Sequence, residues 1–308
     1  MSDLDPEAAK KNSPEQPSEP FPGPFAATGL ALAGLFLSSF IASLLASAGM
    51  VGRSPLMASM GIGYTLGLGG IATLAAQRVP PPHDRRMGLR AFDMNLLPEL
   101  AALLPTLILL SQFNVYLEWI LPPSAEFLEL REQMKSLLVI DSTFSAIQTL
   151  IVAVGIIPII EGFFFFGVLQ QGVTVKMGRL RGALLTTVLY SVVHFPASGA
   201  PGDSLVPLPT WLIIGALLCL VRLASGSILP VIGLTSAFSL IHIAAGGPEP
   251  LFSIPGFNGP GQGIPSLLFW PSLIVVAFGL SRLWKRAKLA PVNIPLPPRQ
   301  GADPGRTV

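Results

Sequence analysis

The sequence predicts an all-α, polytopic membrane protein with about eight transmembrane helices. Of its 308 residues, 51% are hydrophobic and only 12% are charged, whereas soluble domains have about 25% charged residues. The mean hydropathy is +0.63. The apolar residues gather in runs of about 20, the length that a helix needs to cross a bilayer. Polar loops rich in glycine, proline and arginine separate these runs.

Eight runs are long and apolar enough to be expected as spans. They cover residues 25–51, 54–77, 97–121, 143–173, 182–197, 209–223, 227–246 and 264–283. The fourth is long and is expected to bend near Gly155 or Pro158, while the fifth and sixth are short. Together they form one helical membrane domain over residues 25–283. The polar, proline-rich segment 1–24 is expected to be a disordered cytoplasmic tail, and the basic, proline-rich segment 284–308 a second cytoplasmic tail.

The distribution of basic residues predicts the orientation of these spans, because cytoplasmic loops carry an excess of Lys and Arg. With both termini in the cytoplasm, the cytoplasmic segments hold all but three of the 19 Lys and Arg residues; the exceptions are Arg53, Arg131 and Lys135. We therefore expect a multi-pass protein of the inner (cell) membrane, with the lipid bilayer as its main partner. The net charge of +2 does not indicate nucleic-acid binding. The single cysteine, Cys219, cannot form an internal disulfide.

Glu161 is the only ionisable residue between positions 145 and 173. A charged carboxylate near the bilayer centre costs roughly 2.5–3.5 kcal/mol on insertion scales, and such residues mark functional sites by default. The alternative is a protonated Glu in a helix–helix contact. Low dielectric disfavours the charged form of a carboxyl group, which suits a general base that works near neutral pH.

His194 is expected at the same membrane depth as Glu161. The turn between the fourth and fifth spans is centred near position 177 or 178, and each residue lies about sixteen positions from it, on opposite arms of the hairpin. At about 1.5 Å of rise per residue the two side chains reach similar depth. An imidazole can stabilise an oxyanion, so the pair predicts hydrolysis of a peptide bond by activated water. The alternative is a packed histidine that bonds a neighbouring carbonyl group.

The surrounding segment, residues 145–246, resembles the CPBP family of intramembrane proteases, which includes the CAAX prenyl endopeptidases and the bacteriocin-processing or immunity proteins. The family's first motif, Glu-Glu-x-x-x-Arg after an apolar run with a proline, is framed here by IIPIIEGFFFFGVLQ, with Glu161 first. The second, Phe-x-x-x-His, corresponds to YSVVH, with Tyr190 in the Phe position and His194 in the His position. The third, His-x-x-x-Asn/Asp shortly after Gly-Ser, is framed by ASGSILPVIGLTSAFS.

The resemblance implies a CAAX-protease-like bundle in which the first Glu activates water, while two histidines and an Asn support the water and the oxyanion. Glu161 and His194 carry over directly. The sequence departs elsewhere: Gly162 replaces the second Glu, Phe166 the Arg, Thr235 the third-motif His and Ser239 the Asn. Positions 162 and 166 share one helix face, so losing both leaves no orphaned buried charge. That change replaces a polar pair with apolar packing.

Three functions remain open from the sequence. The first is an intramembrane endopeptidase that acts on a membrane-embedded or prenylated peptide, with Glu161 as base, His194 as its partner, and Thr235, Ser239 or His242 as lesser donors. The second is a catalytically inactive pseudoprotease that binds or escorts membrane proteins or peptides. The third is a small transporter, for which Glu99 and Glu118 are the other ionisable candidates within spans.

No cofactor is expected, apart from one metal alternative. Glu161, His194 and His242 would supply two histidines and one carboxylate, the ligand count of a catalytic zinc site. His242 lies seven residues after Thr235, which is about 10 Å along a helix. The zinc site therefore requires His242 to move toward the pair.

Overall fold

The computed structural model describes residues 19–48, 55–129, 131, 142–194, 201–246, 250–259 and 263–290. In these residues the chain folds into helices and forms no extended strand, which confirms the all-α class. The two expected tails lie mostly outside the described residues. The last helix, however, continues through Leu289 and so takes up the start of the expected tail 284–308.

The N-terminal half supplies three long helical stretches. The first is α2 (Pro24–Ser47). The second runs through α3 (Pro55–Gly63), a π-helical segment η1 (Tyr64–Leu68) and α4 (Gly69–Ala76). After the short α5 (His83–Met87), the third runs through η2 (Met94–Leu96), α6 (Leu97–Ala101) and α7 (Thr106–Ile120). Pro24, at the start of α2, loses no hydrogen bond there, because the first helical N–H groups have no partner within the helix.

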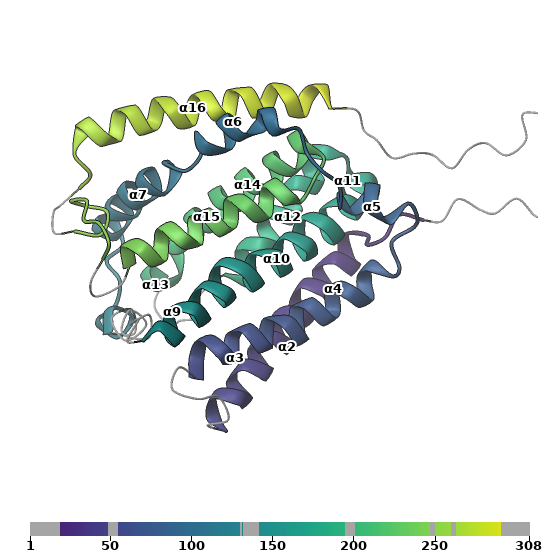
Figure 1. The fold of residues 1–308 in the computed structure, drawn as a ribbon, viewed down its shortest axis with the longest axis horizontal. Helices are drawn as coiled ribbons and strands as arrows, with labels where there is room; N and C mark the ends of the chain where they lie inside the picture. Colours follow the sequence, from purple (N-terminus) through teal and green to yellow (C-terminus); the bar gives the residue numbers. More distant parts are fainter. Residues whose placement is uncertain are drawn as a thin grey trace, which may run out of the picture.

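The C-terminal half contains the longest helix, which comprises α9 (Thr143–Thr149), the π-helical η3 (Leu150–Ile156), α10 (Ile157–Glu161), the π-helical η4 (Gly162–Leu169) and α11 (Gln170–Met177). It is followed by α12 (Arg179–Val193), α13 (Pro201–Leu205), α14 (Pro207–Ser225), α15 (Leu229–Gly246) and α16 (Ser266–Leu289). Figure 1 shows the longest helix in the middle of the bundle, between the α2–α4 hairpin and α15. Helix α16 lies along the opposite edge, beside α6 and α7.

Among the described residues, seven helices are long and apolar enough to cross a membrane. They cover residues 24–47, 57–76, 94–120, 143–177, 203–225, 229–246 and 266–289. The expected fifth span corresponds to α12, which is helical but has only 15 residues. It nevertheless lies along α14, because Tyr190 contacts Trp211 and, farther along, Cys219 contacts the carbonyl oxygen of Ala183.

The fourth expected span contains two π-helical segments, and a bend near Gly155 or Pro158 stays a prediction. The segments η3 and η4 stand on either side of α10, which contains Pro158. A π-helical turn is wider than an α-helical one and is frequent at functional sites. In η4 the side chains of Phe164, Phe165 and Phe166 are almost completely buried. The run of four phenylalanines therefore anchors the central helix in the core directly after Glu161.

Candidate active site

Glu161 and His194 meet inside the bundle. Glu161 ends α10 and is 2% exposed, while His194 is the first residue after α12. The helices are joined at Gly178, whose φ of +86° is a backbone conformation that suits glycine. The resulting hairpin places His194 Nε2 3.2 Å from Glu161 Oε1. The structure therefore brings together the two side chains that the depth argument pairs.

Two contacts hold the imidazole ring of His194 in its orientation. Its Nδ1 lies 2.8 Å from the carbonyl oxygen of Tyr190, and its ring stacks on Trp211 with centroids 4.1 Å apart and planes inclined by 25°. Since a carbonyl oxygen only accepts hydrogen bonds, Nδ1 must carry a proton. The close contact between Nε2 and Oε1 then requires one further proton, held by either His194 or Glu161. The pair is therefore a single proton-sharing unit.

The two oxygen atoms of Glu161 have different surroundings. Oε2 accepts a hydrogen bond from the Tyr190 hydroxyl group at 3.3 Å. Oε1 lies within ion-pair distance of His194, yet it is buried and has no hydrogen bond with suitable angles. At 3.2 Å, a small rotation of either side chain would align a hydrogen bond between Oε1 and His194 Nε2. Oε1 is thus the oxygen that can accept a hydrogen bond from a further donor.

Two tyrosines at this site were not identified as site residues from the sequence. Tyr190 is almost fully buried and donates to Oε2. Tyr64, in the π-helical segment η1, also interacts with the Glu161 side chain through its hydroxyl group. The chain has three tyrosines, and two of them lie at this one buried carboxylate. Nothing in the sequence alone places η1 against α10.

The positions of the missing Glu and Arg are filled by apolar groups. A Cβ atom added at Gly162 would lie 2.4 Å from Cγ1 of Ile232, so α15 packs directly on this glycine. The Phe166 ring packs against Tyr190 with centroids 5.5 Å apart. The backbone oxygen of Phe166 accepts a hydrogen bond from Arg222 Nε at 3.0 Å. Apolar packing therefore replaces the polar pair at positions 162 and 166. The guanidinium group of Arg222, from α14, still reaches the backbone at Phe166.

Among the described residues, no hydrogen bond links Thr235, Ser239 or His242 on α15 to the pair. The Thr235 hydroxyl group donates to the carbonyl oxygen of Val231 in its own helix at 3.0 Å. Ser239 is partly buried, and His242 is exposed. Ser236, which the sequence did not single out, faces the central helix and donates to the carbonyl oxygen of Val154 at 2.7 Å.

The zinc alternative is not assembled in this arrangement. Among the described residues, no group of three or more His, Cys, Asp and Glu side chains is placed to hold a metal ion. His242 is exposed on α15, and the nearest protein group to a Cβ added at Gly246 is its Nε2, at 3.9 Å. The imidazole of His242 therefore extends toward the end of its own helix.

Residues 143–241 match the family model of type II CAAX prenyl endopeptidases, Rce1-like. This segment is Rce1-like. The match runs from α9 into α15 and includes Glu161, His194, Thr235 and Ser239. No curated protein and no solved structure matches the chain.

The Rce1-like match confirms the resemblance that the sequence motifs predict. Together with the seven apolar helices, it identifies an integral, multi-pass membrane protein with a CAAX-protease-like core. His242 follows the matched segment by one residue. The Rce1-like core therefore contains the acid and the first histidine of the family pattern and lacks the second histidine.

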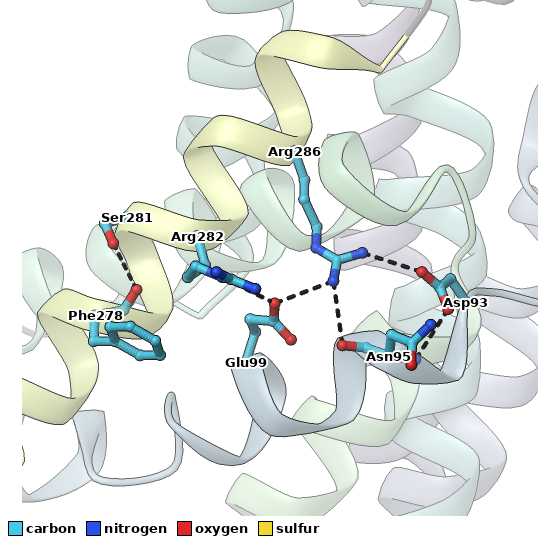
Figure 2. Close-up of polar contacts among 7 residues, drawn as sticks. All are labelled: Asp93, Asn95, Glu99, Phe278, Ser281, Arg282 and Arg286. Atoms are coloured by element: carbon cyan, nitrogen blue, oxygen red, sulfur yellow. Dashed lines mark hydrogen bonds and ion pairs between the residues drawn. The ribbon is translucent and has the colours of Figure 1, made fainter.

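The other two acidic residues within the spans have structural partners. Glu99 is buried and lies 3.2 Å from Arg286 and 3.5 Å from Arg282. Figure 2 shows both guanidinium groups pointing toward its carboxylate. Glu118 lies 2.7 Å from Arg131. Because each carboxylate is paired with a guanidinium, neither needs a transport role to account for its position.

Proposed function

We propose that this Rce1-like protein is an intramembrane endopeptidase in which Glu161 activates water for hydrolysis of a peptide bond. The observation that carries the proposal is the 3.2 Å contact between His194 Nε2 and Glu161 Oε1 inside the bundle. A carboxylate and an imidazole that share one proton can take a proton from water and return it later, which is general acid–base catalysis.

The proposed reaction uses the two side chains in sequence. Glu161 Oε1 accepts a proton from a water molecule, and the water oxygen attacks the carbonyl carbon of the scissile peptide bond. His194 donates a hydrogen bond from Nε2 to the oxyanion that forms. The peptide C–N bond then breaks as the proton held by the pair moves to the leaving amine. Trp211 and the Tyr190 carbonyl group keep the imidazole ring aligned throughout.

The retention of this pair supports a catalytic role on energetic grounds. A buried ion pair is often no more stable than apolar packing of the same size, and this chain has apolar packing at Gly162 and Phe166, where the family has a Glu and an Arg. A function that needs an acid and an imidazole accounts for their presence.

A second candidate is a non-hydrolytic member that binds or escorts a membrane protein or peptide. The observation that favours it is the hydrogen bond from Tyr190 to Glu161 Oε2, together with the Thr235 hydroxyl group bonding within its own helix. Under this reading, the tyrosine hydroxyl group takes one of the positions at the carboxylate that water would otherwise occupy.

The substitution Glu161→Gln tests the base directly. We expect it to lower peptide cleavage by about 100- to 10,000-fold, because a glutamine amide cannot accept the proton of water. The measurement is the cleavage rate of a panel of prenylated and membrane-embedded peptides by purified protein in detergent. Glu118→Gln is the matched control, since it makes the same chemical change at the Arg131 pair. Wild-type cleavage that survives Glu161→Gln would remove Glu161 as the base.

The double substitution Thr235→His and Ser239→Asn separates the two candidates. It restores the third family motif on α15. If wild-type protein cleaves nothing and the double variant cleaves, the chain is an inactive relative with an otherwise intact site. If wild-type protein already cleaves and the double variant changes the rate by less than Glu161→Gln does, the endopeptidase proposal stands.

We further propose that the substrate is a prenylated or membrane-embedded peptide and that both termini lie in the cytoplasm. The orientation rests on the basic residues. Many of the described ones lie in segments that meet at one end of the bundle: the loop around α5, the α11–α12 turn, and the C-terminal ends of α14 and α16. Arg131 lies beyond the far end of α7.

A further inference from the structure

A cavity of about 800 Å³ opens at the basic end of the bundle. Its wall includes six arginines, from four separate parts of the chain: Arg85, Arg86, Arg90, Arg179, Arg222 and Arg286. Among the described residues of the wall, Asp93 is the only acidic one. The lining therefore carries a formal charge of about +5, since arginine is always protonated in proteins.

Only one of these arginines is neutralised by a carboxylate among the described residues. Arg286 lies 3.1 Å from Asp93 and 3.2 Å from Glu99 (Figure 2). The other five make no ion pair with a described acidic residue. Arg90 lies close enough to Arg222 for like-charge repulsion between them. A set of unpaired like charges that share one cavity is stabilised when an anion enters it.

Backbone carbonyl groups hold several of the guanidinium groups in place. Arg222 donates from Nε to the Phe166 oxygen at 3.0 Å and from Nη2 to the Arg86 oxygen at 3.1 Å. Arg90 Nε donates to the Gly226 oxygen at 3.2 Å. Each guanidinium has five N–H donors, so at least three on each remain for a ligand. These donors are oriented before any ligand binds.

Two glycines allow the arginines to lie so close to the backbone. Gly88 and Gly226 have φ angles of +73° and +66°, in the left-handed region. A Cβ atom at Gly88 would lie 2.6 Å from Arg222 Cζ, and one at Gly226 would lie 2.3 Å from Arg90 Nη2. The absence of a side chain at these two turns therefore leaves room for the two guanidinium groups. The orientation of a membrane protein requires only that basic residues lie on one side. It does not require guanidinium groups to be held at fixed positions around a cavity.

We propose that this cavity binds a phosphate-bearing anion, with the headgroup of an anionic phospholipid as the ligand. Arginine forks match the oxygen atoms of a phosphate group in paired hydrogen bonds, and basic pockets between transmembrane helices bind anionic headgroups. The wall also contains the apolar side chains of Leu96, Leu223 and Leu289. They provide contact for the glycerol and upper acyl region of a lipid, which a small inorganic anion lacks.

The test compares two double variants of the full chain in detergent. Arg85→Gln with Arg90→Gln removes two charges from the wall. Arg78→Gln with Arg181→Gln removes two charges from exposed residues near the same end of the bundle that do not line the cavity. Binding of phosphatidylglycerol, phosphatidylcholine and inorganic pyrophosphate is measured by native mass spectrometry and by the ligand-dependent shift of the unfolding midpoint.

We expect phosphatidylglycerol to bind and phosphatidylcholine to bind far more weakly. Loss of Arg85 and Arg90 should weaken phosphatidylglycerol binding by about 30-fold, because each arginine near an anionic lipid surface contributes about fivefold. The Arg78 and Arg181 variant should bind like wild type. If the first variant does not fold, Arg85→Lys with Arg90→Lys keeps the charge and should weaken binding to a smaller extent.

The remaining outcomes distinguish the source of the phosphate. Arginine-dependent binding of pyrophosphate without any of phosphatidylglycerol supports the phosphate site and assigns it to a soluble ligand. Equal binding of phosphatidylglycerol and phosphatidylcholine overturns the proposal. So does binding that falls equally in both double variants, since it would reflect net charge alone.

Discussion

At the scale of single residues, the chemistry of this site depends on which groups occupy the two oxygen atoms of Glu161. Oε1 lies beside His194, and Oε2 accepts a hydrogen bond from Tyr190. The family pattern has Phe at the tyrosine position, so the hydroxyl group is a feature of this chain. It lowers the cost of burying the carboxylate and also occupies an oxygen that water would otherwise approach.

The substitution Tyr190→Phe removes this hydroxyl group and keeps the ring. We expect it to destabilise the protein by about 1–3 kcal/mol, because the buried carboxylate of Glu161 loses one of its two tyrosine partners. The packing of the ring against Phe165 and Trp211 should be retained. Cleavage should be maintained or faster, because one hydroxyl group fewer competes with water for the Glu161 carboxylate. Rates are measured beside thermal unfolding, and a loss as large as that of Glu161→Gln would instead give Tyr190 a direct part in the reaction.

At the scale of helices, α15 packs directly on the central helix at Gly162. A Cβ atom there would lie 2.4 Å from Cγ1 of Ile232, an atom near the root of the side chain that cannot rotate away freely. The π-helical segment η4 begins at this glycine and carries the buried phenylalanines. The contact therefore determines how α15 sits beside the Glu161–His194 pair.

The substitution Gly162→Ala tests this contact. We expect a destabilisation of about 1–3 kcal/mol, the usual cost of overpacking a core. Gly155→Ala in the same helix is the matched control, because nothing lies within 4 Å of a Cβ atom added there. That variant should be neutral or more stable by up to about 1 kcal/mol, since alanine favours helix more than glycine does. Unfolding midpoints in detergent compare the two, and equal effects would mean that Ile232 moves aside at no cost.

At the scale of the whole molecule, basic side chains gather at one end of the bundle and surround the arginine-lined cavity. The segments that meet there are the loop around α5, the α11–α12 turn, and the last turns of α14 and α16. The opposite end has Arg131, which is paired with Glu118. This asymmetry supports one orientation in the membrane, with the cavity facing the cytoplasm.

Reporter fusions test that orientation. Green fluorescent protein fused after residue 308 should fluoresce, since it folds in the cytoplasm. Alkaline phosphatase fused after residue 131 should be active, because that position lies on the other side under the proposed topology. Reversing the two reporters should abolish both signals. Activity of alkaline phosphatase at the C-terminus would place that end outside and contradict the assignment.

The sequence alone determined the helical class, the order of the spans, the family resemblance and the common depth of Glu161 and His194. These features follow from the length of apolar runs and from the fixed rise of a helix along its axis, both of which are local properties. The 15-residue length of α12 was harder to predict from the sequence, because it depends on the residues at which the helix begins and ends.

Only the tertiary structure decided what surrounds the pair. Thr235 and His242 are seven residues apart and were expected on roughly one face of α15, yet the first is partly buried and the second is exposed. Exposure depends on which neighbouring helices reach each level, and helical periodicity does not contain that information. For the same reason, the sequence did not predict that η1 brings Tyr64 to Glu161. It also did not predict the cavity, because its arginines come from parts of the chain that are far apart in sequence.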